Sequence, residues 1–461
     1  MADMRAYDVL VIGSGSGLNL AFSAAANGGD VALVDAGPMG GTCVNLGCVP
    51  SKRLIYPADV LTLIKNSEKL GIHATVDRID FKKIMEDMRR KREASKKHWE
   101  EEVKSRDNIT WFNGVGEFTV DYTMKIPGDI IKAKKIFIAS GSRPFIPPIK
   151  GLEDIDFLTN ETVLELQELP ESMIITGGGY IGVEFGHFFA TMGTKVTIIE
   201  MTPKLLPNVD HEISELLMKE MGKKINILTN TVAKEVKKSA GMKKVIVEDR
   251  ESGQVKELLS EAVLVATGRR SNSDLLKPEK TGVELDRKGY VKVNEFLETS
   301  KDRIWAFGDA IGKHMFTHVA NYEAKIAWHN ANVGSKEDKI RVDYSSVPYA
   351  VFSHPQIGSA GLTEKQARDK GYQILVGKSS YGDVAKGAII GEEGFVKIIV
   401  EKDTRKILGG HIVGPHAPIL IQEITNVMNC ADGTFEPLTK AMHIHPALPE
   451  VIQLAFQNLK I

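Results

Sequence analysis

One plan of strand, glycine turn, helix and second strand with an acidic end occurs twice in this chain, over residues 8–35 and 173–200. In each copy an apolar run rich in Val and Ile precedes a cluster of glycines, as expected of a strand buried on both faces. Such a duplication predicts two α/β domains built on one nucleotide-binding plan. Further apolar runs before glycines, at 136–139 and 263–266, indicate more strands of this kind.

The first copy carries a glycine turn suited to a pyrophosphate. Gly13 and Gly15 let the backbone turn tightly, and the free amides of the following helix meet the phosphate charge. Asp35 lies 22 residues after Gly13, where an acidic side chain reaches a ribose hydroxyl. Leu18 stands where the third glycine of the pattern belongs, so this copy alone is also consistent with a glycine turn in an ordinary α/β domain.

The second copy matches the nucleotide-binding pattern fully. Gly177, Gly179 and Gly182 follow a strand, and Glu200 lies 23 residues after Gly177. An acid at that position binds a free 2'-hydroxyl and repels a 2'-phosphate, so NAD is favoured over NADP. Lys204 weakens this preference, because a nearby cation tolerates a phosphate.

Two cysteines, Cys43 and Cys48, follow the first nucleotide unit. In a regular helix their Cα atoms would be about 8.6 Å apart, whereas a disulfide needs less than about 7 Å. If they pair, the turn must be irregular, and Gly47 and Pro50 supply the means. Two buried, inert thiols remain the alternative. The four-residue spacer and the lack of a second pair argue against zinc, and Cys430 is predicted to be a core residue in a helix.

Composition excludes several classes of protein. The 461 residues predict several domains, and 59 basic against 60 acidic residues provide no cationic field for nucleic acid. Three cysteines are too few for a secreted disulfide framework. The start, residues 1–7, has no apolar signal core, and no apolar run approaches a membrane span. We therefore expect a soluble, cytoplasmic protein.

The remaining segments suggest the chain's organisation. The charged stretch 81–106 is typical of a solvated helix. From Asp343 onwards, strands at 396–400 and 407–413 and a helix at 418–429 indicate a terminal domain of mixed type. In the tail, the prolines 446 and 449 fit the first turn of a helix.

Several separated motifs together carry a family resemblance. Residues 40–52 resemble the redox-active segment of the class I pyridine nucleotide-disulfide oxidoreductases, which include dihydrolipoamide dehydrogenase, glutathione reductase, mercuric reductase and mycothione reductase. Residues 177–184, 266–269, 299–309 and 445–450 follow in that family's order along the whole chain.

The resemblance implies an α/β fold with two Rossmann-like three-layer domains, one for FAD and one for NAD, and a C-terminal α+β dimerisation domain. The implied boundaries are residues 1–150 for the FAD domain with the redox disulfide, 151–270 for the NAD domain, 271–342 for a central segment contacting FAD, and 343–461 for the interface domain. A homodimer is implied as well.

The resemblance also assigns roles to side chains. Cys48 is implied to be the thiol beside the flavin and Cys43 the thiol that exchanges with substrate. His445 matches the base that takes the thiol proton, oriented by Glu450 and supplied in the family by the partner subunit. Lys52 and Glu184 match an ion pair near the flavin, while His443 is interpreted as a structural histidine. The cofactor-binding positions implied are Gly13, Gly15, Asp35, Thr42, Lys52, Gly116, Ser140, Gly141, Arg269 and Asp309 for FAD, and Gly177, Gly179, Gly182 and Glu200 for NAD. Gly268 is a further implied cofactor-binding position.

Within the family, Glu200 and the stretch 205–210 favour dihydrolipoamide dehydrogenase, whose substrate is lipoamide, free or on a carrier domain, and whose partners include 2-oxoacid dehydrogenase and glycine cleavage components. Residues 451–461 contain no cysteine pair, which argues against mercuric reductase. Residues 56–60 and 352–355 resemble mycothione reductase, so a reductase of mycothione or another small disulfide is the alternative. A flavin-bound redox sensor without enzyme activity is the alternative from another class, and the presence of two cysteines argues against a flavin oxidase that uses one.

Overall fold

The computed structural model describes residues 4–430 and 432–460, so the first three residues of the start, Ala431 and Ile461 lie outside the described residues. The chain divides into two compact units, each made of three stretches of sequence. The first unit comprises Met1–Arg53, Lys82–Phe145 and Gly268–Val342, and the second comprises Leu54–Phe81, Ile146–Thr267 and Asp343–Ile461.

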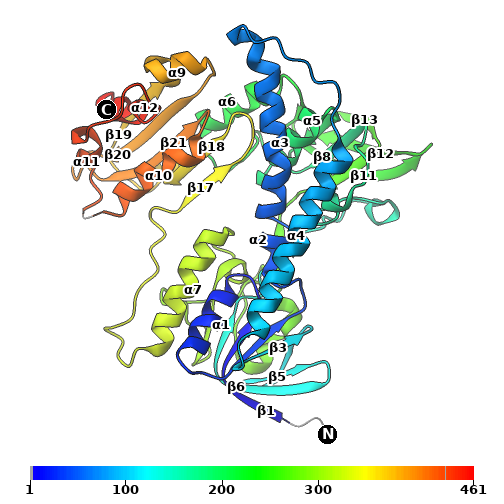
Figure 1. The fold of residues 1–461 in the computed structure, drawn as a ribbon, viewed down its shortest axis with the longest axis vertical. Coiled ribbons are helices and arrows are strands. Elements are labelled where there is room, and N and C mark those ends of the chain that lie inside the picture. Colours follow the sequence, from blue (N-terminus) through cyan, green and yellow to red (C-terminus); the bar gives the residue numbers. More distant parts are fainter. Residues whose placement is uncertain (1–3, 431, 461) are drawn as a thin grey trace. The chain divides into compact units, whose positions relative to one another are not determined.

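The first unit is built on a seven-stranded sheet with the order β3-β2-β1-β6-β5-β4, in which β16 pairs with β6 (Figure 1). Strands β1, β2, β3, β6 and β16 pair in parallel, and β4 and β5 extend the sheet antiparallel. The apolar runs before the glycines form its buried centre, as predicted. The strands are β1 Met4–Ile12, β2 Val31–Asp35, β3 Ile109–Asn113, β4 Glu117–Val120, β5 Thr123–Ile126, β6 Asp129–Ile138 and β16 Ile304–Ala306.

The helices of the first unit come from distant parts of the sequence. Helices α1 (Gly17–Ala26) and α7 (Thr317–Asn332) lie side by side (Figure 1). Helix α2 (Gly41–Asn45) is short, and α4 (Phe81–Lys104) is the charged helix predicted at 81–106. Helix α3 (Cys48–Asn66) begins in this unit and continues in the second. Strands β7 (Ser142–Pro144) and β15 (Arg269–Ser271) form a two-stranded ribbon.

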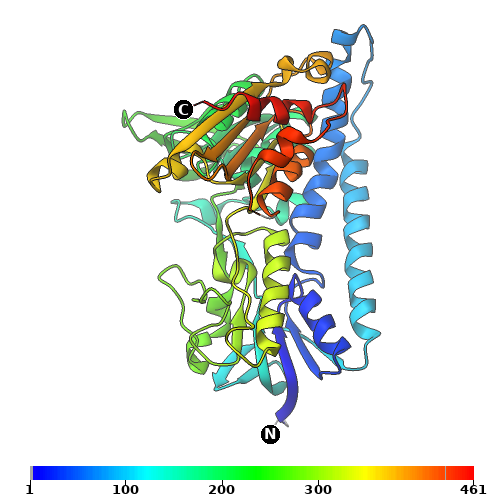
Figure 2. The same cartoon turned by 90° about the vertical axis from the view of Figure 1, so that its left-hand side faces the viewer.

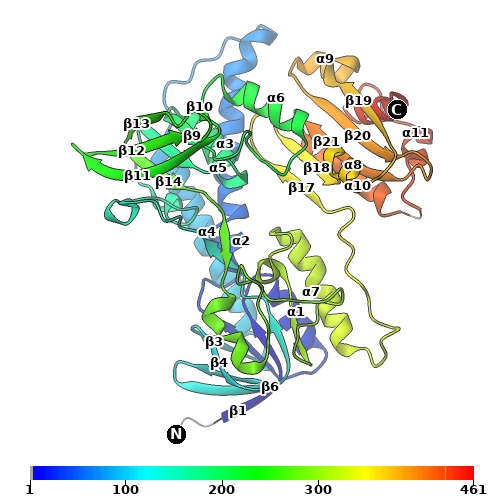
Figure 3. The same ribbon diagram turned by 180° about the vertical axis from the view of Figure 1, so that it is seen from behind.

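The second unit contains the second copy of the nucleotide-binding plan. Its parallel sheet has the order β10-β9-β8-β14, and an antiparallel sheet of β11, β12 and β13 lies beside it (Figure 3). Helix α5 (Tyr180–Met192) follows β8, and α6 (His211–Met221) follows β9. The strands are β8 Ser172–Thr176, β9 Lys195–Ile199, β10 Asn226–Leu228, β11 Thr231–Ser239, β12 Met242–Asp249, β13 Val255–Ser260 and β14 Ala262–Val265.

The terminal part of the second unit is a five-stranded antiparallel sheet with the order β17-β18-β21-β20-β19. Helices α10 and α12 pack against the sheet, as the orange and red helices in Figure 2 show. The strands are β17 Pro348–Val351, β18 Ile357–Gly361, β19 Ile374–Ser380, β20 Phe395–Glu401 and β21 Ile407–Val413; the helices are α8 Glu364–Asp369, α9 Ala385–Ile390, α10 Ala417–Met428, α11 Glu436–Lys440 and α12 Glu450–Gln457.

The fold class predicted from the sequence is confirmed, with two Rossmann-like sheets and a terminal α+β domain. Two local predictions are wrong. Cys430 is exposed in a bend after α10 ends at Met428, because the helix stops two residues short of it. Pro449 is the N-cap of α12 rather than a residue of its first turn.

A buried ion cluster in the second unit connects α6 to the terminal sheet. The Lys397 ammonium on β20 lies 3.1 Å from Asp210, 2.7 Å from Glu212 and 2.8 Å from Glu364. Burial opposes the charge of Lys397, but the hydrogen bonds to these carboxylates outweigh burial and raise its pKa. Removing one partner from such a cluster leaves buried charges uncompensated.

We therefore predict that Lys397→Met destabilises the protein by about 3 kcal/mol, because three carboxylates lose their shared cation. Urea unfolding monitored by circular dichroism measures the change. The control Lys219→Met removes an exposed ion pair with Glu393 and should cost less than about 1 kcal/mol. Equal effects of the two substitutions would contradict a structural role of the buried cluster.

Candidate functional site

The first glycine turn requires glycine at position 13. Gly13 has a φ of +110°, and a Cβ there would lie 2.1 Å from the carbonyl oxygen of Ala139. The Asp35 carboxylate at the end of β2 accepts hydrogen bonds from the amide of Ser14 and, at 2.7 Å, from that of Gly37. The turn is therefore held in shape by the acid that the sequence predicts to bind a ribose.

The second glycine turn repeats this geometry. Gly177 has a φ of +106°, and a Cβ there would lie 2.3 Å from the carbonyl oxygen of Ala266. The buried Glu200 carboxylate accepts hydrogen bonds from the amide of Gly178 at 2.6 Å and from that of Thr202 at 2.8 Å. Both copies thus place an acid in contact with the loop after the first strand.

The two copies differ where Leu18 replaces the third glycine. In the second copy a Cβ on Gly182 would lie 2.0 Å from the carbonyl oxygen of Gly177, so a side chain has no room. In the first copy α1 begins at Gly17, four residues after Gly13, whereas α5 begins three residues after Gly177. The later start accommodates Leu18, which is buried in the core of the first unit.

The segment that carries the cysteines contacts the first glycine turn through the backbone. A Cβ on Gly41 would lie 2.5 Å from the Cα of Gly15. The Asn45 amide group donates to the carbonyl oxygens of Met39 at 3.0 Å and Gly41 at 2.9 Å. Thr42, predicted to bind the cofactor, is the second residue of α2 and therefore lies next to this close contact.

The cysteines lie on either side of a break between two helices. Cys43 is in α2, Cys48 is the first residue of α3, and Leu46 and Gly47 interrupt the helix between them. Both are free thiols, Cys43 half-buried and Cys48 exposed. A hydrogen bond with Cys48 and burial raise the pKa of Cys43, while the charge of Lys52 opposes that rise. The two thiols are thus close enough to interact, as an irregular turn allows.

Further predicted cofactor residues gather around Asp309 in the same unit. The Ser142 hydroxyl donates to its carboxylate at 2.5 Å, and the Arg269 Nε lies 3.8 Å from it. The glycines at 141 and 268 have positive φ, and a Cβ on either would meet no atom within 4 Å. Ser140 lies 3.4 Å from Ser273, hydroxyl to hydroxyl.

These residues fit the flavin dinucleotide that the sequence implies. The Ser14 hydroxyl in the first turn is buried without a hydrogen-bond partner among the described residues. Asp35 and Asp309, both predicted to bind FAD, belong to the same unit as the cysteines. Gly116 lies just before β4, where a Cβ would be 2.3 Å from the Met124 sulfur, and its contact with the cofactor stays a prediction.

The two residues of the predicted ion pair belong to different units, Lys52 to the first and Glu184 to the second. Glu184 on α5 is buried and accepts a hydrogen bond from the Phe352 amide at 3.0 Å. Lys52 on α3 acts electrostatically on Cys43. Their pairing stays a prediction.

The predicted base and its orienting acid are in contact. His445 Nδ1 lies 2.8 Å from the Glu450 carboxylate, which also accepts from the Ala447 amide at 3.0 Å. The Ala447 amide and then His445 lower the pKa of Glu450. An ionised Glu450 accepts from Nδ1–H, which leaves Nε2 to take a proton. His443 instead pairs with Glu423 at 3.1 Å, as expected of a structural histidine.

Two sets of side-chain contacts were not predicted from the sequence. Thr317 Oγ1, at the start of α7, lies 3.7 Å from the Cys48 sulfur. In the second unit, His187 lies 3.4 Å from Asp59 and stacks on His354, and burial lowers the pKa of His354 to about 4. Asp59 and His354 lie in the two segments that resemble mycothione reductase, but no motif marks His187 or Thr317.

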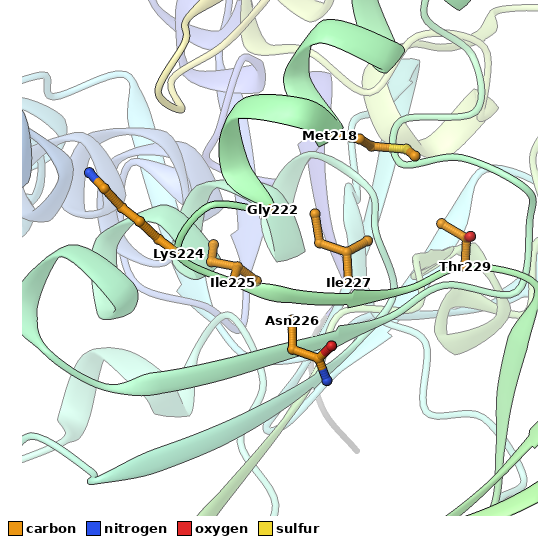
Figure 4. Close-up of a pocket in the computed structure, with 7 residues that line it drawn as sticks. All are labelled: Met218, Gly222, Lys224, Ile225, Asn226, Ile227 and Thr229. Atoms are coloured by element: carbon orange, nitrogen blue, oxygen red, sulfur yellow. The ribbon is translucent and has the colours of Figure 1, made fainter.

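A recess of about 630 Å³ in the second unit is formed by α6, β10 and the segment that joins them (Figure 4). Met218 and Gly222 line it from the end of α6, and Asn226 and Ile227 from β10. The rest of its lining is Lys224, Ile225 and Thr229. None of these side chains is a thiol, an acid or an imidazole, so we assign the recess no redox chemistry.

Neither a metal centre nor a membrane-spanning helix is found among the described residues. Within residues 4–430 and 432–460, no three or more His, Cys, Asp or Glu side chains are grouped to hold a metal ion. No helix in the described part of the chain is both long and apolar enough to cross a membrane.

The first unit combines a thiol pair with a glycine turn suited to a dinucleotide, and the second unit contains another such turn. This combination defines the class of two-dinucleotide disulfide oxidoreductases.

Comparison with known proteins agrees with this class. The chain is 34% identical to a mycothione reductase of Mycobacterium tuberculosis, over 99% of this chain and 100% of the relative. It is 34% identical to a dihydrolipoyl dehydrogenase of Chlorobaculum parvum, over 97% and 96%. The HOCl-induced flavoprotein disulfide reductase RclA of Escherichia coli superposes with a TM-score of 0.86 at 28% identity, covering 98% of this chain and 100% of that one.

The chain belongs to the pyridine nucleotide-disulphide oxidoreductase family, whose model matches residues 7–324. The dimerisation domain of the same family matches residues 347–456, which supports a homodimer. The family uses FAD and NAD(P)H. The chain is therefore a flavin-dependent oxidoreductase with a disulfide redox centre, while the roles of its individual residues stay predictions.

Gly13→Ala should weaken FAD binding by about tenfold or more, because alanine meets both an unfavourable positive φ and the Ala139 carbonyl. The ratio of flavin absorbance to protein in the purified enzyme, and refilling of apoprotein with FAD, measure the loss. The control Gly128→Ala also has a positive φ, of +87°, but a Cβ there meets no atom within 4 Å. Full flavin content in Gly13→Ala would show that this turn does not hold the cofactor.

Proposed function

We propose that this enzyme is an NAD-linked disulfide oxidoreductase of the dihydrolipoamide dehydrogenase type, which passes electrons between a small dithiol and NAD(H) through Cys43 and Cys48. The bound flavin supplies the two-electron chemistry that connects thiols with a nicotinamide. The side chains of the protein bind, orient and move protons.

The environment of Glu200 is the observation that carries the choice of NAD. Its carboxylate is fixed by two backbone amides at the end of β9, where it meets a 2'-hydroxyl and repels a 2'-phosphate. The cation that weakened this inference, Lys204, donates to the Val209 carbonyl at 2.7 Å. Arg250 likewise donates to the Met201 carbonyl at 2.8 Å. Both cations are thus engaged by backbone oxygens.

The thiol chemistry follows from the contacts of the pair and of the base. A substrate dithiol exchanges with the Cys43–Cys48 disulfide by attack of a thiolate, so a proton must leave the attacking sulfur. His445, oriented by Glu450, is the group proposed to take it through Nε2. In the homodimer this imidazole is proposed to come from the other subunit.

The remaining assignments belong to the same proposal. The boundaries at 150, 270 and 342 mark the FAD, NAD, central and interface domains. The substrate is proposed to be lipoamide, free or on a carrier domain of a 2-oxoacid dehydrogenase or glycine cleavage system, and the location to be cytoplasmic.

A specific observation favours a second candidate, a reductase of mycothione or a similar small disulfide. The two segments that resemble mycothione reductase meet around one imidazole, since His187 lies 3.4 Å from Asp59 and stacks on His354 with ring centroids 6.2 Å apart. The M. tuberculosis mycothione reductase also matches the chain over its full length.

Steady-state kinetics separate the two candidates. Turnover with NAD(H) against NADP(H), crossed with lipoamide, glutathione disulfide and mycothiol disulfide, should be highest for the NAD and lipoamide pairing. Glu200→Gln should lower the ratio of kcat/KM for NADH over NADPH by about tenfold, because the repulsion of a 2'-phosphate is lost. The control Glu257→Gln alters an exposed acid on β13 that pairs with Lys244 and should leave the ratio unchanged. A wild-type preference for NADPH with mycothiol disulfide would overturn the first candidate in favour of the second.

A further inference from the structure

The first strand of the terminal sheet contacts the helix that follows the second glycine turn at two points. The ring of Tyr349 on β17 packs edge-on against the ring of Tyr180 on α5, with ring centroids 6.0 Å apart and an interplanar angle of 72°. The amide of Phe352, just after β17, donates to the Glu184 carboxylate on α5 at 3.0 Å. All four residues belong to the second unit. Because Tyr180 and Glu184 are one helical turn apart, β17 holds one face of α5.

Tyr180 lies within the second glycine turn itself. It is the first residue of α5 and follows the N-cap Gly179 directly. Gly177 and Gly182, which have no room for a side chain, lie on either side of it in the sequence. The amides at such a helix start meet the phosphates of a dinucleotide. The ring of Tyr180 therefore starts beside these amides, where a bound cofactor can pack against it.

The contact between the two tyrosines is a packing contact between neutral rings. Burial raises the pKa of Tyr180, and burial raises the pKa of Tyr349 to about 12. Both phenols therefore stay uncharged in neutral solution. Edge-to-face aromatic pairs stabilise a particular orientation of the two rings, beyond the effect of burial alone. Tyr349 thus restricts the orientation of Tyr180.

Tyr349 is itself fixed by the sheet that carries it. It pairs across the strands with Ser359 on β18, which continues the sheet to β21. The same sheet is attached to the nucleotide-binding part of the unit at a second place, where Lys397 on β20 binds Asp210 and Glu212 at the start of α6. The position of Tyr349 relative to α5 therefore does not depend on the aromatic contact alone.

We propose that Tyr349 is a positioning residue for the nicotinamide dinucleotide, because it fixes the ring of Tyr180 against which the cofactor packs. A ring that is fixed before binding loses less freedom when the cofactor arrives, so the affinity is higher. This inference rests on the proposed binding of the nicotinamide dinucleotide at the second glycine turn, but not on the choice between NAD and NADP. The domain that matches the dimerisation model thereby also supports cofactor binding.

The test uses the FAD-loaded enzyme with ferricyanide as electron acceptor, so that no disulfide substrate is needed. The values of kcat and KM are measured for NADH and for NADPH. The variants are Tyr349→Val, Tyr180→Leu, the double variant and the conservative Tyr349→Phe. The control is Tyr372→Val, which alters a tyrosine of the same unit that is 38% exposed and lies between α8 and β19. Flavin content and thermal unfolding show that each variant is folded.

Tyr349→Val should raise KM for NADH about fivefold and leave kcat within about twofold, because the ring of Tyr180 is no longer fixed. KM for NADPH should rise by the same factor, since Tyr180 lies at the glycine turn and Glu200 at the end of β9. Tyr349→Phe and Tyr372→Val should behave like the wild-type enzyme. The double variant should have the kcat/KM of Tyr180→Leu, because Tyr349 acts through Tyr180.

The double variant decides between positioning and a general structural role. If the losses of kcat/KM in Tyr349→Val and Tyr180→Leu multiply in the double variant, Tyr349 does not act through Tyr180 and the inference is wrong. An unchanged KM in Tyr349→Val would contradict it as well. If Tyr349→Val loses flavin, Tyr349→Met, which is closer in volume, replaces it in the same comparison. A wild-type preference for NADPH would overturn the proposed coenzyme and leave this inference standing.

Discussion

Two cysteine side chains five positions apart can touch only where the helix between them is interrupted, and the whole redox site depends on that interruption. Leu46 and Gly47 end one helix before Cys48 begins the next, which brings its sulfur to Cys43. The same segment contacts the first glycine turn by backbone alone, at Gly41. The position of the thiols and the shape of the first glycine turn are therefore coupled. The backbone at Gly41 is packed directly against the backbone at Gly15, so a shift of one alters the other.

The two glycine turns share one backbone geometry. In each copy the first glycine faces a carbonyl oxygen of a neighbouring strand end, and in each an acid at the end of the second strand binds the loop amides. The copies diverge at the third glycine, where α1 begins one residue later than α5 does and Leu18 replaces glycine. This divergence is local because the strand pairings that support both turns are parallel and equivalent.

Local patterns predicted the two nucleotide-binding sheets, and the order of the separated motifs predicted the family. Buried strands, glycine turns and acids at fixed spacing depend on residues that are close together in the sequence. The same is true of the irregular turn between the cysteines. Contacts between distant segments were not predictable in this way. Thr317 meets Cys48 across 269 positions, and His187 joins Asp59 to His354 without a motif of its own. Cys430 was misplaced because apolar composition does not mark where a helix ends.

We propose that the enzyme stores two electrons in the cysteine pair in addition to two in its flavin. An anaerobic titration of the oxidised enzyme with NADH, followed by absorbance, tests this most directly. We expect the first equivalent to open the disulfide and to produce long-wavelength absorbance while the flavin stays largely oxidised. A second equivalent should be needed to bleach the flavin. Complete bleaching by a single equivalent, with no long-wavelength absorbance on the way, would contradict it.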